Sequence, residues 1–293
     1  MRVTFNMAFR NGVYDINRAA DAMARAQREV SSLKRVQRPS DDPSAASQVV
    51  AERTEQRQLD SFIDATASVD ARLRVADSVL SDTLNLLTTA QTKTAAANNS
   101  YVTQQQRDAL ALEIEGIRDT LLSNVNTQVK GAYIFSGTDL TDQPYTKDGL
   151  GVVQAYAGNS SNQILDIDRN RAVAVTFDGD ALVDTLFADL DALVTAIRSG
   201  DGAGMQAGMQ QLQAAFERAT AMQSRVGNDL SDLDEQQLRL DQMKRASETR
   251  RSGLEDANLA EAITNMSQAE TAHSAALKAV AAANRPSLLD YLS

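Results

Sequence analysis

Two short motifs in this chain of 293 residues have the residue types of a ligand site. Residues 166–168 (Asp-Ile-Asp) place two carboxylates two positions apart, as in a calcium loop, but the rest of an EF-hand loop is missing. Residues 200–204 (Gly-Asp-Gly-Ala-Gly) have the glycines of a phosphate loop, but no Gly-Lys-Ser/Thr follows them. We therefore interpret the first motif as part of a strand and the second as a flexible linker between helices.

Three titratable residues also require a decision. Asp41 and Asp42 are adjacent carboxylates, but a catalytic pair would need a substrate cleft, of which there is no sign in the sequence. We interpret them as helix-capping residues. His273 is the only histidine and lies in an apolar row, where an interface residue is more common than a catalytic one. A histidine at an interface could still make assembly sensitive to pH. We expect no catalytic, metal-binding or cofactor-binding residue.

Composition excludes several classes of protein. The chain has no cysteine and a net charge of −10, so disulfides, thiolate metal sites and a protein-wide basic surface for nucleic acid are excluded. No apolar run approaches the ~18 residues that a membrane span requires, so we expect no membrane insertion. Residues 1–40 nevertheless carry eight Lys or Arg against three Asp or Glu. This excess is typical of a solvated helix face, but it could also complement acidic neighbours in an assembly.

Helix-breaking residues divide the chain into three parts. Residues 44–115 contain neither glycine nor proline, which favours a very long helix from Pro43 to about residue 97. Glycines crowd the region 131–179, where apolar residues alternate with a period of two in residues 132–135, 165–168 and 173–177. We expect antiparallel strands there, a turn at 178–179, one helix from 180 to 198, and a further long helix through 205–240.

Both ends of the chain carry apolar residues at seven-residue spacing, the pattern of helices that pack along a partner. We expect residues 1–38 and 254–285 to pair with each other and to become fully ordered only in an assembly, because an isolated pair is marginal. The expected assembly-interface residues are Phe9, Ile16, Met23, Val30, Leu259, Ala262, Ile263, Met266, Ala269, His273, Ala276, Leu277 and Val280.

Four motifs, in this order, carry a family resemblance. They are Pro39-Ser40-Asp41-Asp42-Pro43, read as a turn between a terminal and a bundle helix, residues 131–137 (Gly-Ala-Tyr-Ile-Phe-Ser-Gly), residues 254–262 (Leu-Glu-Asp-Ala-Asn-Leu-Ala-Glu-Ala) and residues 287–292 (Ser-Leu-Leu-Asp-Tyr-Leu). Together they resemble the flagellar hook-associated protein 3 family, the hook–filament junction proteins of the flagellin-like superfamily. The resemblance covers about residues 1–137 and 180–293, and leaves 138–179 without a family signal.

The resemblance implies a mainly α fold, a long antiparallel coiled-coil-like helical bundle with a small inserted β domain. We expect a terminal-helix assembly domain of residues 1–40 and 250–293, a helical bundle domain of 41–137 and 180–249 with a short β-hairpin, and a small outward β domain of 138–179.

The implied function is structural. The chain would join the hook to the filament as a thin extracellular layer, after unfolded export through the flagellar type III apparatus. The implied partners are hook-associated protein 1, flagellin, copies of the chain itself and a flagellar export chaperone.

Three alternatives remain open at this point. Flagellin itself shares paired terminal helices, although the 39–43 turn and the 287–292 ending favour the junction family. A coiled-coil signalling rod would have seams without a β insertion, and would usually need a membrane span. An enzyme is the least favoured class, for the reasons given above.

Overall fold

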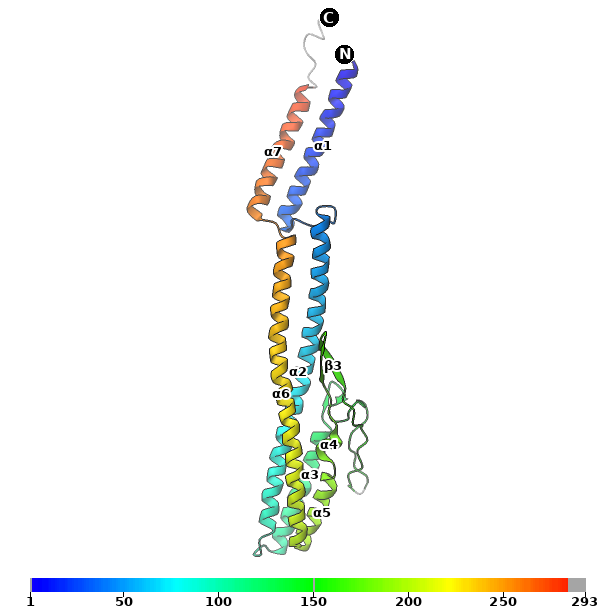
Figure 1. Cartoon of the computed structure of the whole chain (residues 1–293), viewed down its shortest axis with the longest axis vertical. Coiled ribbons are helices and arrows are strands. Elements are labelled where there is room, and N and C mark those ends of the chain that lie inside the picture. Colours follow the sequence, from blue (N-terminus) through cyan, green and yellow to red (C-terminus); the bar gives the residue numbers. More distant parts are fainter. Residues whose placement is uncertain (1, 150, 284–293) are drawn as a thin grey trace. The chain divides into compact units, whose positions relative to one another are not determined.

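The computed structural model describes residues 2–149 and 151–283, and the expected helix stop at Pro286 and the 287–292 motif lie outside them. In this part the chain forms seven helices and four short strands. The helices are α1 (Arg2–Ser32), α2 (Pro43–Ala97), α3 (Gln104–Val125), α4 (Gly179–Val183), α5 (Leu186–Ser199), α6 (Gly202–Glu255) and α7 (Leu259–Ala283). The strands are β1 (Gln128–Val129), β2 (Ala132–Tyr133), β3 (Ile164–Asp168) and β4 (Arg171–Ala174). The expected mainly α fold is confirmed (Figure 1).

The chain divides into two compact units. Unit 1 comprises residues 1–58 and 243–293, and unit 2 comprises residues 59–242. Unit 2 contains the whole of the segment 138–179. The finer division into three domains that the sequence suggests is not tested by these two units and stays a prediction.

Unit 2 is built on the antiparallel packing of α2 and α6. Side chains bridge the two helices at Gln91–Gln213 and at Asp77–Gln223, so the chain runs up one helix and down the other. Rows of residues at seven-residue spacing supply the buried face of each helix. The fully buried members of these rows include Leu73, Leu80, Leu87, Leu212, Ala219, Val226 and Leu233.

Helices α3 and α5 complete the bundle of unit 2. They lie side by side and are joined by ion pairs of Arg118 with Asp191 and of Arg198 with Glu115. Thr103 caps α3 in a capping box with Gln106, which has the Thr-x-x-Gln spacing of this motif. Gly200 ends α5 in the left-handed conformation, with φ +73°.

The strands form two separate antiparallel hairpins, β1–β2 and β3–β4. The expected strand 165–168 lies within β3, whereas 132–135 is a strand only in its first two residues and 173–177 overlaps β4 only at 173–174. Strand β1 was not expected. Beyond β4 the chain still bonds its neighbours, because Phe177 N donates to Ile134 O and Gly137 N donates to Phe177 O. An aromatic cluster fills the space behind these segments, with Tyr145 stacked edge-on against Phe187 of α5 at 5.2 Å between ring centroids.

Three local expectations were wrong. Asp178-Gly179 is not a free turn, because Asp178 caps α4 and Gly179 begins it. The single helix expected over 180–198 is broken at Asp184, which adopts φ +41° between α4 and α5. The glycine-rich segment 200–204 is not a flexible linker, because α6 already begins at Gly202.

Candidate assembly surface

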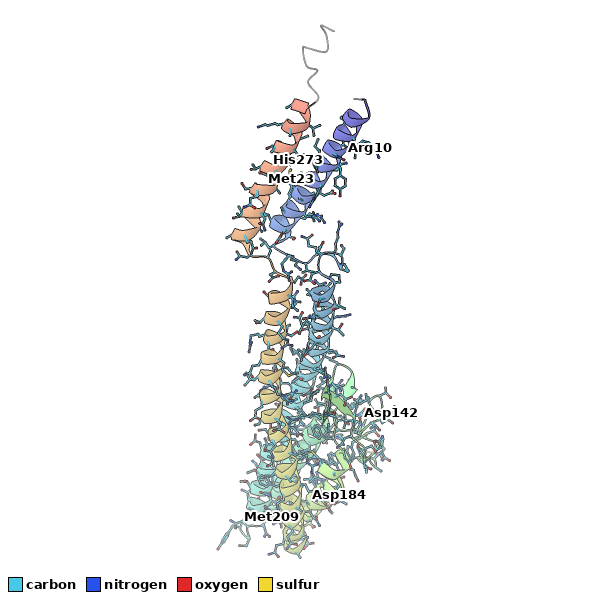
Figure 2. The ribbon with its side chains drawn as sticks, turned by 45° about the horizontal axis from the view of Figure 1, so that its top comes forward. Arg10, Met23, Asp142, Asp184, Met209 and His273 are labelled. Atoms are coloured by element: carbon cyan, nitrogen blue, oxygen red, sulfur yellow. The ribbon has the colours of Figure 1, made fainter. Side chains whose placement is uncertain are left out.

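The terminal helices α1 and α7 lie side by side and antiparallel in unit 1 (Figures 1 and 2). Small residues allow this close approach. A Cβ added at Gly12 would lie only 2.7 Å from Cγ2 of Val280, so the two helices meet at this glycine. Ala26 and Ala262 are buried, the latter with 1% of its surface exposed. The half-buried residues on the two helices include Ile16, Met23, Val30, Met266, Ala269, His273, Ala276 and Val280.

The remaining residues expected at the assembly interface are exposed in the single chain. Ile263 and Leu277 have 52% and 47% of their surfaces exposed, and Phe9 and Leu259 are similarly open. Met7, Val13 and Tyr14 on α1 are also exposed, although they are not among the expected interface residues. The seven-residue spacing between Met7 and Tyr14 is a signal in the sequence that could have indicated these two residues. We call these residues the open apolar set: Met7, Phe9, Val13, Tyr14, Leu259, Ile263 and Leu277.

The segment 33–42 connects α1 to α2 and contains four of the five expected turn residues, Pro39, Ser40, Asp41 and Asp42. Asp42 Oδ1 accepts a hydrogen bond from the Ala45 backbone N–H at 3.0 Å, and Pro43 is the first residue of α2. Asp41 Oδ2 accepts from the backbone N–H groups of Arg38 at 2.9 Å and Gln37 at 3.2 Å. These contacts make both carboxylates structural.

The two aspartates have lowered pKa values for the same reason. The hydrogen bond from the Arg38 backbone holds the pKa of Asp41 below its usual range, and the bond from the Ala45 backbone does so for Asp42. Each bond favours the charged carboxylate, so both side chains are ready acceptors at neutral pH rather than proton donors.

The connection between α6 and α7 binds directly to the connection between α1 and α2. Backbone hydrogen bonds join Ala257 N to Leu33 O at 2.9 Å and Arg35 N to Glu255 O at 2.8 Å. Lys34 and Asp256 form an isolated antiparallel bridge. The two connections that carry the terminal helices are therefore tied to each other.

A nearly buried carboxylate lies at this corner. Glu255 is 3% exposed, and its carboxylate contacts Lys34 Nζ at 2.7 Å, Arg53 Nη2 at 2.5 Å and Arg251 Nη1 at 3.4 Å. Burial raises its pKa, but the hydrogen bond from Lys34 and the nearby positive charges outweigh this and lower the pKa overall. The sequence carries no local signal for this cluster, because Lys34 and Glu255 are 221 positions apart.

A second carboxylate joins α2 to α6 in unit 1. Arg250 binds Glu52 through two hydrogen bonds, of 2.8 and 3.0 Å, and Ser247 Oγ donates to Glu52 Oε2 at 2.8 Å. Both helices are thereby fixed next to the turns that carry α1 and α7.

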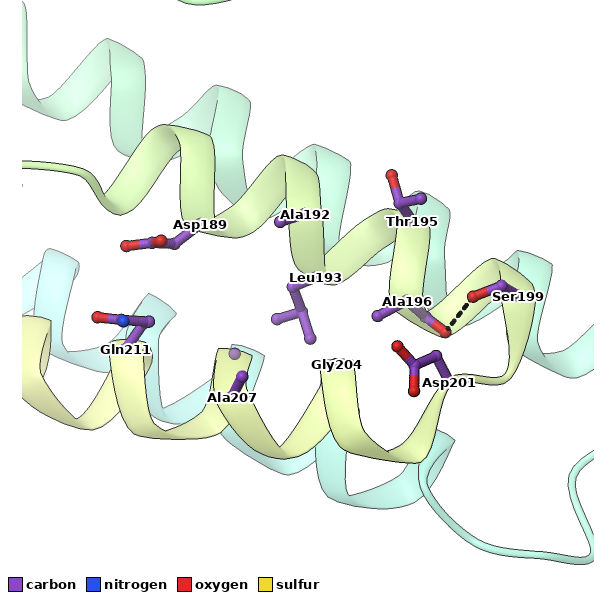
Figure 3. A pocket seen from close by; sticks show the side chains of 11 residues that line it. Asp189, Ala192, Leu193, Thr195, Ala196, Ser199, Asp201, Gly204, Ala207 and Gln211 are labelled. Carbon is purple, nitrogen blue, oxygen red and sulfur yellow. Dashed lines mark hydrogen bonds between the residues drawn. The ribbon is translucent and has the colours of Figure 1, made fainter.

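The groove between α5 and α6 in unit 2 has a volume of about 470 Å³ (Figure 3). Its wall consists mainly of small residues such as Ala192, Ala207 and Gly208. The two acidic side chains at its edge are already bonded, since Thr185 Oγ1 donates to Asp189 and the Ala203 backbone donates to Asp201. The two hydroxyls that line the groove donate to backbone carbonyls, Thr195 to Asp191 and Ser199 to Ala196.

The motifs that resemble ligand sites have structural partners. Asp168 Oδ2 accepts hydrogen bonds from Arg239 at 2.6 Å and from Gln236 at 3.1 Å, which fixes the β3–β4 hairpin to α6. Within residues 2–149 and 151–283, no three His, Cys, Asp or Glu side chains are grouped as a metal site would require. None of the described helices is long and apolar enough to span a membrane.

The sequence of the chain matches two models of a known protein family. The bacterial flagellin N-terminal helical region matches residues 3–139, and the bacterial flagellin C-terminal helical region matches residues 209–292. The chain is 28% identical to flagellar hook-associated protein 3 of Escherichia coli (strain K12) over 217 residues, 68% of this chain and 67% of that protein.

A second relative and a solved structure are also flagellar hook-associated proteins. The chain is 28% identical over 187 residues to flagellar hook-associated protein 3 of Salmonella typhimurium, covering 64% of this chain and 58% of that protein. The structure of a flagellar hook-associated protein from Vibrio parahaemolyticus shares the fold, with a TM-score of 0.69 and 18% identity over 74% of this chain and 100% of that one. The chain belongs to the flagellar hook-associated protein 3 family of flagellin-like proteins.

Proposed function

We propose that this chain is a structural subunit of the bacterial flagellum that joins the hook to the filament. The observation that carries this proposal is the open apolar set on paired terminal helices. The apolar side chains of α1 and α7 that the pairing leaves exposed include Phe9, Ile263 and Leu277. Such a surface is typical of a protein–protein contact rather than of a finished monomer surface.

Energetics favour covering this surface by other subunits. Fixing the backbone of each residue costs about 1–2 kcal/mol, whereas burying a large apolar side chain returns about 1.5–3 kcal/mol. Within α1 and α7, most seam residues are only half-buried. Neighbouring subunits would supply the missing burial, so copies of this chain are its first proposed partners.

The other partners belong to the two sides of the proposed layer. We propose hook-associated protein 1 on the hook side and flagellin on the filament side, with export through the flagellar type III apparatus assisted by a chaperone. The proposed interface is the residue set given in the sequence analysis, from Phe9 to Val280. The role is mechanical, and we propose no enzymatic activity.

Flagellin, the filament subunit, is the second candidate, because both matched family regions are those of flagellin. The two named relatives are hook-associated proteins, which supports the junction. Electron microscopy of a strain that lacks this chain separates the two. We expect hooks without filaments and intact flagellin shed into the medium. Complete filaments in that strain would refute the junction role, and loss of flagellin itself would favour the second candidate.

The terminal-helix interface is tested by charge insertion. Ala269→Arg and Ala276→Arg place a guanidinium among half-buried alanines of α7, which should block incorporation into flagella. Thermal melting of the purified chain should change little, because the pairing of α1 and α7 contributes little to the stability of the monomer. Ala221→Arg, at an exposed alanine of α6, is the matched control and should incorporate normally. A large loss of melting temperature in the α7 variants would place these alanines in an ordinary core instead.

A further inference from the structure

A polar cleft of about 220 Å³ lies in unit 1, beside the end of α1 and the 33–42 connection. Four cationic side chains line it: Arg25, Arg28, Lys34 and Arg35. Two carboxylates, of Glu29 and Asp41, also line it, so positive charge is in excess. A concave surface with an excess of one charge attracts ligands of the opposite charge.

Hydrogen bonds and ion pairs within unit 1 compensate only part of the positive charge of the cleft. Lys34 is bonded to Glu255, and Arg35 is bonded to Asp42 and to the Leu254 carbonyl. Asp41 accepts hydrogen bonds from two backbone N–H groups, and its charge also interacts with that of Arg28. Arg25, by contrast, forms no hydrogen bond or ion pair with any residue that the structure describes.

Most of the N–H donors of Arg28 form no hydrogen bond within the described part of the chain. Only its Nε is engaged in a hydrogen bond to the described part of the chain, with the Ala24 carbonyl at 3.1 Å. A guanidinium has five N–H donors in a fixed fork that suits a carboxylate. Arg25 and Arg28 are three positions apart on α1 and so lie on one side of the helix. The two guanidinium groups therefore keep N–H donors that are available to a ligand outside the described part of unit 1.

The distribution of charge along the chain indicates what fits there. Unit 1 contains 16 Lys and Arg against 13 Asp and Glu, whereas unit 2 contains 13 against 26. Copies of this chain are also neighbours in the proposed layer. Each cleft would therefore be surrounded by subunits whose unit 2 has a large excess of carboxylates, and opposite charges at an interface fix register and partner choice.

We propose that the Arg25/Arg28 cleft of one subunit receives carboxylate side chains from unit 2 of a second copy of this chain. This inference rests on the proposed function, because it needs several copies in one layer. It adds a defined polar contact to the apolar contacts of the terminal helices, and this contact would set the register between subunits.

Photo-crosslinking in assembled flagella tests the identity of the occupant. Arg25 is replaced with p-benzoylphenylalanine in the full chain, flagella are purified and irradiated, and the products are mapped by mass spectrometry. The same replacement at Arg57, an exposed arginine of α2 outside the cleft, is the control. We expect a homodimer from position 25, joined to a peptide within residues 59–242. A crosslink to flagellin, to hook-associated protein 1 or to unit 1, or no crosslink at all, would overturn the proposal.

Charge reversal tests the contribution of the contact. Arg25→Glu with Arg28→Glu should reduce the number of filaments per cell about tenfold, since it replaces attraction by repulsion at each subunit contact. Arg57→Glu should have no such effect, because Arg57 makes only local hydrogen bonds. Arg25→Lys with Arg28→Lys keeps the charge and should retain most filaments.

The result is distinguishable from failure of the proposed function. Normal filaments in the charge-reversed strain, together with bare hooks in the strain that lacks the chain, would refute the cleft contact alone. Normal filaments in both strains would refute the junction role, and the cleft contact with it.

Discussion

At the scale of single residues, the Glu255 carboxylate is the most informative group. It is nearly inaccessible to water and contacts three cationic side chains: Lys34 of the 33–42 connection, Arg53 of α2 and Arg251 of α6. Removing one partner of such a cluster leaves the others poorly compensated, although Lys34, Arg53 and Arg251 each retain some exposure to water. The cluster therefore contributes more to how the 33–42 connection packs against α2 and α6 than to the net stability of the fold.

The lowered pKa of Glu255 predicts the direction of its pH dependence. A carboxyl whose pKa is lower in the folded than in the unfolded state stabilises the fold above its ordinary value of 4.5, and this stabilisation is lost as pH falls through the folded-state value. We expect Glu255→Gln to lower the free energy of opening of this corner by about 1–3 kcal/mol at pH 7. Hydrogen exchange of residues 33–58 measures this free energy of opening. The difference in free energy between the variant and the parent should become smaller in acid.

The control for this prediction is Glu248→Gln. Glu248 is an exposed residue of α6, also in unit 1, and it forms no ion pair with any described residue. Its replacement should leave exchange at the corner unchanged at both pH values. Equal protection in the Glu255→Gln variant and the parent at pH 7 would show that the cluster does not stabilise the corner.

At the scale of secondary structure, the contact of Gly12 with Val280 opposes the usual effect of a helical glycine. Glycine within a helix costs about 0.5–1 kcal/mol relative to alanine, so Gly12→Ala should stabilise an isolated α1. In the folded chain the added methyl group would lie 2.7 Å from Cγ2 of Val280, whose branched side chain has little freedom to move. Overpacking of this kind costs about 1–3 kcal/mol, which outweighs the gain.

We therefore expect Gly12→Ala to reduce hydrogen-exchange protection in α1 and α7. Gly116→Ala in α3 is the matched control, because an added Cβ there has no atom within 4 Å. It should raise the free energy of unfolding by about 0.5–1 kcal/mol. Adding Val280→Ala to Gly12→Ala should remove the steric cost. If Gly12→Ala and Gly116→Ala stabilise equally, the helices do not meet closely at this glycine.

Elements with local signals were predictable from the sequence, and those determined by distant contacts were not. The start of α2 at Pro43, the capping box of Thr103 and the end of α5 at Gly200 follow from residue types within a few positions. The break at Asp184 has no such signal, since neither glycine nor proline marks it. The contact of Lys34 with Glu255 joins segments with no shared local pattern, so only the folded chain reveals it.

At the scale of the whole molecule, the main question is where the chain obtains the stability of its ends. In unit 2, Leu73, Leu80 and Leu87 are completely buried among neighbouring helices. In α1 and α7 of unit 1, the open apolar set remains exposed and most seam residues are only half-buried. Local stability follows the amount of apolar burial, so the two parts of the chain should open with very different free energies.

Hydrogen exchange of the purified chain and of the same chain in isolated flagella tests this difference. In the purified chain, amides of α1 and α7 should exchange at least about a hundredfold faster than those around Leu80, because opening a sparsely covered pair costs little. In flagella the terminal helices should become as protected as the bundle, since neighbouring subunits cover their apolar faces. Equal protection of α1, α7 and the bundle in the purified chain would show that the ends are stable alone. Assembly would then depend on specific contacts between folded surfaces rather than on ordering of the ends.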